Sequence, residues 1–437
     1  MGLFICRTLR KGFVFGGHMN YLLKKLKEFG DINVSIVGAG LMGKSIFAQL
    51  INIENFNPVC LASRNINKVM EFLDEMEVDF EVCDTISKAQ DAVKKGKVVA
   101  TDVNEIAAAL NVHAVVDATG NIEAGAKLSL DAIKYGRDIV SLNVEMDVTC
   151  GIEIYRRARE NGLIYTGIAG DEPGAIRELY EFANFVDLEV LALGKGKNNP
   201  LNVYATVEEL AEEAISKKLS PRMLTSFVDG TNTMIELNAV ANSTGFVPDV
   251  RGCHNISADT KTLPSILSLK EEGGILNSYK VVDFVRGIAP GVFAVVRAKS
   301  KSMDYDMRFL KMGDGPNYLL YRPYHLTSIE VPISLAKAVL LRDTSIVSSF
   351  DTPAAETICV AKRDILPGEK LEGIGGNTIY GTLEKYSVKK REDLVPIGFI
   401  NENAVAKRHI KKGMCLTSKD VALDENSVVM SLRKPFD

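Results

Sequence analysis

Short runs of hydrophobic residues alternate with longer amphipathic stretches over the first third of the chain. Ile32, Val34 and Ile36 alternate with polar residues and lead into Gly38, and apolar residues then recur at helical spacing. Apolar runs of strand length follow at residues 59–62, 98–100, 114–116 and 139–142, with helical stretches between them. This alternation predicts a doubly wound parallel sheet with helices on both faces. The chain is therefore expected to have an α/β fold with a Rossmann-type domain over residues 31–167.

The next block, residues 168–350, combines helix and strand patterns without regular alternation. The helical stretches are 208–217, 221–241 and 332–341, and the apolar runs are 188–193 and 291–298. This mixture predicts an α+β domain for substrate binding or oligomerisation. We expect its last helix to pack back onto the Rossmann-type domain.

An internal repeat distinguishes the C-terminal block, residues 351–437. Residues 361–371 (AKRDILPGEKL) recur as residues 406–416 (AKRHIKKGMCL), with Ala, Lys, Arg, Ile, Gly and Leu in matching places. Each copy has a glycine, Gly368 or Gly413, where a strand–turn–strand unit needs its turn. Short strands dominate here, so a small all-β domain is predicted.

Composition and charge exclude several classes of protein. Of the 437 residues, 52 are Lys or Arg and 56 are Asp or Glu, a balance that argues against binding nucleic acid over a broad basic face. No apolar run approaches the ~20 residues that cross a bilayer. Seven scattered cysteines, never spaced as CxxC, exclude a disulfide scaffold and suit a reducing compartment. We expect a cytoplasmic protein with neither nucleic-acid nor membrane partners.

The N-terminal residues 1–30 precede the first predicted strand. Residues 1–18 are basic and lack the continuous apolar stretch of a secretory signal, whereas a helix is predicted from Met19. We interpret the first residues as an extension, or as an over-extended start of the reading frame.

A glycine motif follows the first predicted strand. Gly38, Gly40 and Gly43 form G-x-G-x-x-G between a strand and a helix, the context that distinguishes a dinucleotide site from a plain turn. The first glycine permits a tight turn, the second lets the backbone approach a pyrophosphate, and the third lets helix and strand pack closely. The intervening Leu41 and Met42 belong to the same expected cofactor contact.

The end of the second predicted strand indicates which cofactor binds. An NAD enzyme usually has an acidic residue there for the ribose 2′-hydroxyl, but residues 55–70 contain no Asp or Glu. Ser63 and Arg64 end this strand instead, and a hydroxyl beside a guanidinium suits the 2′-phosphate of NADP. A lone arginine is also compatible with a simple solvated charge.

Polar residues end the fourth and fifth predicted strands. Thr119 and Gly120 follow one strand, and Asn143 follows the other. Because the carboxyl ends of parallel strands meet at the ligand crevice, these residues are expected beside the cofactor. Asp117, just before them, is as readily a helix N-cap as a reactive group.

Basic and polar residues in the middle block are candidates for substrate binding. Lys195, Lys197 and Asn198 lie in a glycine-containing run after the strand 188–193, where they would hold a phosphate or carboxylate; a solvated basic turn is the alternative. A polar cluster on the helical stretch 221–241 includes Arg222, Ser226, Asn232 and Glu236, of which the first three are expected to bind substrate.

Acidic residues follow two predicted strands. Asp171 and Glu172 begin a helical stretch, and Glu145 and Asp147 follow the strand 139–142. Carboxylates suit a hard divalent cation such as Mg²⁺ or Mn²⁺, whereas an ordinary acidic helix start explains the first pair equally well. Glu145 and Asp171 are the metal candidates, and Glu172 is a candidate catalytic residue.

Arg322 and His325 follow a glycine-rich segment. They are candidates for anion binding or proton transfer, since a near-neutral pKa suits histidine to acid–base work. A single histidine is more often structural, and His254 is a weaker candidate of the same kind.

Several longer segments point to a known family. They are AGDEPGA (169–175), GKGKNNP (194–200), PRMLTSFVDGTNTM (221–234), VRGIAPGVFAVV (285–296) and GDGPNYLLYRPYHLTSIEVP (313–332). Together with the glycine motif they resemble a homoserine-dehydrogenase-like oxidoreductase family with a C-terminal SAF (β-clip) domain, and the C-terminal repeat is similar to SAF. The resemblance covers nearly the whole chain from Asn20.

The resemblance implies a chemistry. The family includes 1-deoxy-D-xylulose 5-phosphate reductoisomerase-like enzymes, which use NADPH and a divalent cation to make 2-C-methyl-D-erythritol 4-phosphate. It also includes oxidoisomerases of branched sugar acids such as D-apionate. It implies a homodimer, a small anionic sugar-derived substrate, and a lysine beside the reacting carbonyl, for which Lys195 and Lys197 are the candidates. The homoserine dehydrogenase substrate motif is missing.

Three hypotheses follow. The first is an NADP-dependent reductoisomerase acting on 1-deoxy-D-xylulose 5-phosphate, and the second an NAD-linked oxidoisomerase of a branched sugar acid. The third is a non-catalytic nucleotide-binding sensor or assembly factor, since SAF domains also occur in assembly proteins. The polar clusters at strand ends argue against the third.

Overall fold

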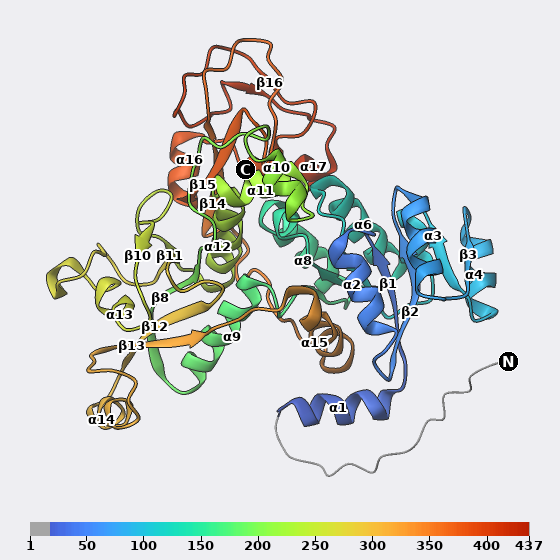
Figure 1. Ribbon diagram of the computed structural model, residues 1–437, viewed down its shortest axis with the longest axis horizontal. Helices are drawn as coiled ribbons and strands as arrows, with labels where there is room; N and C mark the ends of the chain where they lie inside the picture. Colours follow the sequence, from blue (N-terminus) through green and yellow to red (C-terminus); the bar gives the residue numbers. More distant parts are fainter. Residues whose placement is uncertain (1–17, 437) are drawn as a thin grey trace.

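The computed structural model describes residues 18–436 (Figure 1). Residues 1–17 and 437 lie outside this range, so the interpretation of the N-terminal extension is not tested. Helix α1 (His18–Phe29) agrees with the helix predicted from Met19. Within the described residues, the chain forms none of the long apolar helices that could span a bilayer.

A parallel sheet forms the first part of the molecule. Its strands are β1 (Ile32–Val37), β2 (Phe56–Ala62), β3 (Phe80–Val82), β4 (Val98–Thr101), β5 (Ala114–Asp117), β6 (Asp138–Ser141) and β7 (Tyr165–Gly167). They lie in the order β3-β4-β2-β1-β5-β6-β7, and all neighbours are parallel. The strand order reverses beside β1, so the ligand crevice of this fold lies where β1 and β5 end. The predicted Rossmann-type sheet is confirmed.

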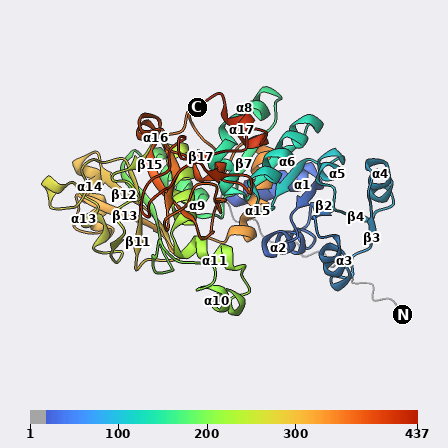
Figure 2. The ribbon, with the colours of Figure 1, turned by 90° about the horizontal axis from the view of Figure 1, so that it is seen from above.

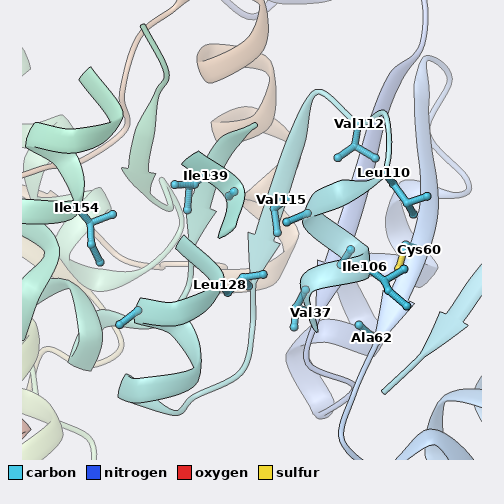
Figure 3. Close-up of a cluster of buried hydrophobic side chains, with 14 of the residues drawn as sticks. Val37, Cys60, Ala62, Ile106, Leu110, Val112, Val115, Leu128, Ile139 and Ile154 are labelled. Atoms are coloured by element: carbon cyan, nitrogen blue, oxygen red, sulfur yellow. The ribbon is translucent and has the colours of Figure 1, made fainter. Parts of the chain in front are cut away.

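Helices cover both faces of this sheet. They are α2 (Leu41–Leu50), α3 (Ile66–Glu75), α4 (Ile86–Lys94), α5 (Asn104–Ala109), α6 (Ile122–Tyr135), α7 (Val144–Met146) and α8 (Ile152–Glu160), with a π-helical turn, Asp147–Gly151, between the last two. Alternate strand residues therefore enter two separate cores. Val37, Val115 and Ile139 pack on one face with the helical Leu128 (Figure 3), whereas Ile36 packs on the other.

A mixed sheet forms the middle part. Its strands are β8 (Leu188–Gly196), β9 (Val247–Pro248), β10 (Ile256–Ser257), β11 (Val281–Arg286), β12 (Val292–Ala298) and β13 (Asn317–Arg322). The order is β10-β11-β8-β12-β13, with β9 also beside β11; β12 runs antiparallel to β8 and β13.

The middle part has seven helices among the described residues. They are α9 (Glu172–Phe185), α10 (Ala211–Ser216), α11 (Pro221–Val228), α12 (Thr231–Thr244), α13 (Leu263–Ile266), α14 (Lys301–Phe309) and α15 (Val331–Ala336). Helices α9 and α12 share a core with β8, β11 and β12, so both present their first turns near the end of β8. Residues of α15 pack in the core of the parallel sheet, as the sequence predicted for the last helix of this block.

In the C-terminal part, short strands are joined by long irregular segments (orange to red in Figure 1). The strands are β14 (Ala355–Ala361), β15 (Ile379–Lys385), β16 (Val405–Ala406) and β17 (Val421–Ala422), accompanied by the helices α16 (Tyr386–Glu392) and α17 (Val428–Arg433). The two repeats face each other, since the matching residues Ile365 and Ile410 pair as an antiparallel bridge. Their turn glycines, Gly368 and Gly413, both have φ +80°.

The structure differs from the sequence-based expectation at three places. Strand β8 continues through Gly196, so Lys195 belongs to a strand and not to the loop after it. The helical stretch 221–241 is two helices, because Gly230 has φ +86° and starts a new helix. Strands β11 and β13 were not predicted, since Asp283 interrupts the apolar run of β11 and the run in β13 is only four residues long (318–321); the two-residue strands β9 and β10 were not predicted either.

Candidate active site

The glycine motif forms the turn between β1 and α2. Gly38 has φ +114°, and a Cβ there would lie 2.2 Å from the carbonyl oxygen of Ala118 at the end of β5. A Cβ on Gly43 would lie 1.7 Å from the carbonyl oxygen of Gly38. Both glycines are therefore required by close packing at the carboxyl ends of β1 and β5.

Gly40 differs from its two neighbours because the space around it is open. It is the N-cap of α2, and a Cβ there would have no atom within 4 Å. Leu41 and Met42, at the start of the helix, are 70% and 41% exposed. An open cradle at the positive end of a ten-residue helix fits the pyrophosphate of a dinucleotide.

Ser63 and Arg64 follow directly after β2, where the ribose of a dinucleotide lies in this fold. The Ser63 hydroxyl accepts a hydrogen bond from the backbone of Asn65 at 3.4 Å, and Asn65 caps α3. Arg64 is exposed. Their contact with an adenosine 2′-phosphate stays a prediction.

Asn143 and Thr119 lie in a buried network behind the glycine turn. Asp117 accepts hydrogen bonds from the backbone and hydroxyl of Thr119 at 2.9 and 2.7 Å and from Asn143 at 3.3 Å. Asn143 also donates to the carbonyl of Asn121 at 2.9 Å, and Asn121, rather than Asp117, caps α6. Asn143 is only 1% exposed, and its hydrogen bonds hold Asp117 and the start of α6 in place. Gly120 is exposed at the crevice.

A cavity of about 460 Å³ lies between the glycine turn and the end of β8. The parallel-sheet part contributes Met42, Leu142, Val144 and Glu145. The middle part contributes polar residues from several elements: Asp171, Glu172, Lys195, Lys197, Asn198, Asn232, Glu236 and His325. Residues that are far apart in the chain thus surround one space beside the expected cofactor.

Lys195 lies between two carboxylates in this cavity. Its Nζ donates to Glu172 at 2.5 Å and to Glu236, and all three side chains are largely buried. Burial alone would lower the pKa of Lys195, but the two carboxylates together hold it above its ordinary value. Lys195 is therefore a buried ammonium.

The three acids near Lys195 differ in the direction in which their pKa is shifted. Burial would raise the pKa of Glu172, but Lys195, Asp171 and His325 hold it below its ordinary value. Burial, and then the charge of Glu172, raise the pKa of Asp171 well above its ordinary value and that of Glu236 to about 8. Glu172 is therefore the acid of the three that ionises most easily, whereas burial favours the protonated forms of Asp171 and Glu236.

Asp171, Glu172 and His325 form a group with the geometry of a metal site. One ligand atom from each lies within 4.8 Å of the others, and Nε2 of His325 is 3.3 Å from Glu172. Two carboxylates and an imidazole are ligands for Mn²⁺ or, with water, Mg²⁺. Glu145 lines the cavity but is not in this group, and burial raises its pKa.

Lys197 lies two residues after Lys195, directly beyond the end of β8. Its Nζ donates to the carbonyl of Phe227, at the end of α11, at 2.6 Å. Burial, and then the ammonium of Lys195, lower its pKa to about 8. It is a cation that faces the cavity without a carboxylate bound to its Nζ.

The structure does not bring all predicted substrate residues together. Asn198, Asn232 and His325 line the cavity, and Asn232 donates to Glu236 at 2.7 Å. Arg222, Ser226 and Arg322 are not among its lining residues. Arg222 donates to the carbonyl of Ile374, and Ser226 donates to that of Met223. Arg322 pairs with Glu178 and Glu330. Arg222 and Ser226 point away because α11 turns only part of its surface to the cavity.

Glu236 is the main site residue without a predicted role. It belonged to the polar cluster on the stretch 221–241, but its partner Lys195 lies on another element. The signal in the sequence was its spacing: Asn232 and Glu236 are four residues apart in α12, and so share one face of the helix.

Two protein-family models match the chain. Residues 170–331 match the catalytic domain of oxidoreductase DRL, and residues 21–142 match shikimate/quinate 5-dehydrogenase. The first match contains the cavity residues of the middle part, and the second contains the glycine turn and the crevice. No curated protein matches the sequence.

Solved structures resemble parts of the chain at low identity. NADPH-bound 1-deoxy-D-xylulose 5-phosphate reductoisomerase from Zymomonas mobilis is 18% identical over 46% of this chain and 58% of that chain, with TM-score 0.31. A DOX-P reductoisomerase in complex with magnesium is 13% identical over 70% and 68%, with TM-score 0.38. Apo scyllo-inositol dehydrogenase from Lactobacillus casei is 10% identical over 67% and 68%, with TM-score 0.34. At these identities the likeness concerns the fold, and the ligands named belong to the compared proteins.

The fold and the site define an oxidoreductase that uses a nicotinamide cofactor. The open glycine turn fits the dinucleotide, and the buried ionisable residues of the adjoining cavity match an oxidoreductase catalytic domain. The chain is an NAD(P)-dependent oxidoreductase with a Rossmann-type cofactor domain. The non-catalytic hypothesis is accordingly set aside.

Proposed function

We propose that the protein is an NADP-dependent reductoisomerase acting on a small anionic sugar derivative, with 1-deoxy-D-xylulose 5-phosphate as the first substrate. The product would be 2-C-methyl-D-erythritol 4-phosphate. The family resemblance of the middle segments suggests this reaction. The observation that supports it most directly is Lys195, a buried ammonium held by Glu172 and Glu236 in a cavity that opens onto the cofactor turn.

The nicotinamide, when bound, supplies the hydride. The protein must then deliver a proton to the oxygen that the reduction leaves negative, and must stabilise the charge that develops there. Lys195 is suited to both tasks, because its ammonium is already desolvated and fixed by the side chains of Glu172 and Glu236. Glu236, with a pKa of about 8, holds the proton that can replace the one Lys195 gives up.

The carbon shift that precedes reduction needs a proton moved between two neighbouring oxygens. His325 and Lys195 both contact Glu172, so the three form a continuous chain of groups that exchange protons. Such a chain can take a proton from one oxygen and return it to the next. Asn232 fixes the orientation of Glu236 at one end of this chain.

A divalent cation fits the group of Asp171, Glu172 and His325 by the type of its ligands. When bound, it would polarise the substrate carbonyl as a Lewis acid. Because burial and the charge of Glu172 raise the pKa of Asp171, cation binding there competes with a proton, so we expect metal affinity to rise with pH.

The substrate's anionic end is expected near Lys197. Its charge is only partly present above pH 8, so affinity for a phosphate should fall as the pH rises through that value. Lys217 lines the same cavity and supplies a second positive charge.

One observation favours the second candidate, an NAD-linked oxidoisomerase of a branched sugar acid. Of the four candidate cations, Lys195, Lys197, Arg222 and Arg322, only the two lysines line the cavity. A carboxylate needs fewer cations than a phosphate dianion. The position of Arg64 favours NADP and therefore the first candidate.

We also propose that the protein works as a cytoplasmic homodimer and that its C-terminal part is an SAF domain. The antiparallel pairing of the repeats through Ile365 and Ile410 supports the domain assignment. Light scattering of the purified protein would test the dimer.

The proposed function is tested by following NADPH oxidation at 340 nm with a panel of sugar phosphates and, in the reverse sense, NAD⁺ or NADP⁺ reduction with sugar acids. Each reaction is run with magnesium, with manganese and with a chelator. Turnover of 1-deoxy-D-xylulose 5-phosphate with NADPH supports the first candidate. Turnover of a branched sugar acid alone would replace it by the second.

A further inference from the structure

One side of the active-site cavity is formed by a segment that lacks sheet structure of its own. This cap segment, residues 198–230, includes α10 and α11, which project at one edge of the molecule (Figure 2). It contributes six residues to the cavity lining: Asn198, Asn199, Lys217, Leu219, Leu224 and Phe227. Its position therefore decides the shape of the cavity.

The C-terminal part of the chain contacts the cap segment from the side away from the cavity. Asn377 accepts a hydrogen bond from the backbone of Val207 at 2.8 Å, and Arg222 donates to the carbonyl of Ile374 at 3.3 Å. A Cβ on Gly375 would lie 2.0 Å from the carbonyl oxygen of Arg222, so the two backbones touch.

The strongest of these contacts is made by Lys362. Its Nζ lies 2.8 Å from Oδ2 of Asp229 and donates to the carbonyls of Ala205 and Gly376, each at 2.8 Å. Lys362 is 4% exposed and Asp229 is 1% exposed. A buried ammonium with three oxygen partners is fixed in place, because losing any of them leaves a desolvated charge.

Asp229 lies at the junction of the two helices that reach the active site. Its Oδ1 accepts from the backbone of Thr231, the first residue of α12, at 2.8 Å. That helix presents Asn232 and Glu236 to the cavity. In the other direction, α11 ends at Phe227–Val228, where the carbonyl of Phe227 accepts from Lys197. Movement of Asp229 would therefore reach both Lys197 and Glu236.

We propose that Lys362 is a positioning residue for the active site: the C-terminal part fastens the cap segment through Lys362 and so sets where Lys197 and Glu236 lie. This role depends on the cavity and not on which substrate occupies it. It also gives the C-terminal part a function in catalysis without any contact to substrate.

The repeat provides a matched control. Lys407 occupies the place in the second repeat that Lys362 occupies in the first. It is exposed, and its Nζ is 3.4 Å from the carbonyl of Ser418 in its own part of the chain. Lys407→Met therefore removes the same side chain from an equivalent backbone position without touching the cap segment.

The test compares the full-length protein with Lys362→Met, with Lys407→Met and with the double variant Lys362→Met/Asp229→Asn. No turnover is needed, so a wrong substrate does not affect it. Three quantities are measured: amide hydrogen exchange of the cap segment, the pH profile of Lys197 acetylation by mass spectrometry, and NADPH affinity by fluorescence. The double variant removes both charges and so separates positioning from the cost of an unpaired carboxylate.

We expect exchange in the cap segment to rise about tenfold or more in Lys362→Met. The acetylation midpoint of Lys197 should move upward from about 8, because the amine becomes better hydrated. NADPH affinity should change less than about twofold, since the glycine turn is outside the cap segment. Lys407→Met should match the wild type in all three quantities.

The double variant decides the interpretation. Its melting temperature, measured in addition, should recover, while cap exchange and the Lys197 profile stay altered. If the double variant also restores cap exchange and the Lys197 profile, Lys362 serves only to balance a buried charge. If Lys362→Met leaves cap exchange and the Lys197 profile as in the wild type, the proposal is wrong.

Discussion

Buried carboxyl groups have different partners in the parallel-sheet part, which we call the cofactor half, and in the middle part around the cavity, which we call the substrate half. In the cofactor half, burial raises the pKa of Asp117 and Asp147, and the hydrogen-bond donors to them are Thr119, Asn143 and Tyr165. In the substrate half, burial also raises the pKa of Asp171 and Glu236, but the ammonium of Lys195 and its neighbours hold that of Glu172 below its ordinary value. One half is built from hydroxyl and amide contacts, and the other from an ion pair.

This difference separates scaffold from chemistry. A buried acid that stays neutral needs only hydrogen bonds, and it can be surrounded by fixed backbone. In a buried ion pair, a proton can pass between the two groups or to a substrate, so the pair can take part in a reaction. We therefore expect substitutions in the cofactor half to alter binding or stability, and substitutions in the substrate half to alter turnover.

The largest effect is expected for Lys195→Met. It removes the proton donor and leaves Glu172 and Glu236 facing each other, so kcat should fall about 10²–10⁴-fold. NADPH affinity, measured by fluorescence without substrate, should stay within about twofold, because no cofactor contact is lost. Lys299→Met is the control: that lysine is half-exposed and pairs with Asp187 at 2.5 Å. An equal loss in NADPH affinity would contradict the separation of the two halves.

The same comparison explains what the sequence could predict. The cofactor half was predictable because its determinants are contiguous: a strand, a glycine motif and a helix occupy residues 32–50. The close approaches of Gly38 and Gly43 are short-range consequences of that turn. The substrate half joins residues 171, 195, 236 and 325, and their pairing depends on how α9 and α12 cover the mixed sheet.

Lys195 and the glycines on either side of it show where the sequence pattern predicted the wrong local structure. Lys195 was recognised, but as a loop residue, because the glycines around it suggested a turn. Those glycines are in the strand since a Cβ on Gly194 would lie 2.0 Å from the carbonyl oxygen of Asp283, and one on Gly196 would lie 2.4 Å from the backbone of Ala289. Close strand–strand and strand–loop packing, and not flexibility, requires them.

Asp147→Asn tests whether burial in the cofactor half raises the pKa of this acid. Burial raises the pKa of Asp147 to about 6 from 3.8, while Tyr165 donates to it at 2.7 Å. Between these values the folded protein binds more protons than the unfolded chain, so the contribution of Asp147 to stability is lost as the pH rises. The variant, which does not titrate, should gain up to about 3 kcal/mol relative to wild type between pH 4 and pH 7.

Urea denaturation of both proteins across this pH range measures the difference. Asp84→Asn is the control, because Asp84 is exposed, pairs with Lys88 and has a lowered pKa. Its small effect should have the opposite sign. A stability difference between Asp147→Asn and wild type that does not change with pH would show that this carboxyl is ionised when folded.

Gly40→Ala should weaken cofactor binding without disturbing the fold. The added methyl group meets no protein atom within 4 Å, but it occupies the open cradle at the N-terminus of α2. We expect NADPH affinity to fall about tenfold, or about 1.4 kcal/mol, with an unchanged melting temperature. Gly43→Ala should instead lower the melting temperature, because its methyl group collides with Gly38. Equal melting losses in both variants would contradict the assignment of Gly40 to the cofactor.

Arg64→Ala should give the smallest effect and should act on one coenzyme only. If the guanidinium after β2 contacts a 2′-phosphate, the variant should bind NADPH roughly fivefold more weakly, while its affinity for NADH, which lacks that phosphate, is unchanged. Arg64 is exposed, so the preference of the wild type should also shrink as salt rises. Lys68→Ala, one turn into α3, is the control for a general loss of positive charge. Equal weakening of both coenzymes by Arg64→Ala would remove the structural reason for preferring NADP, and with it the main argument for the reductoisomerase over the NAD-linked oxidoisomerase.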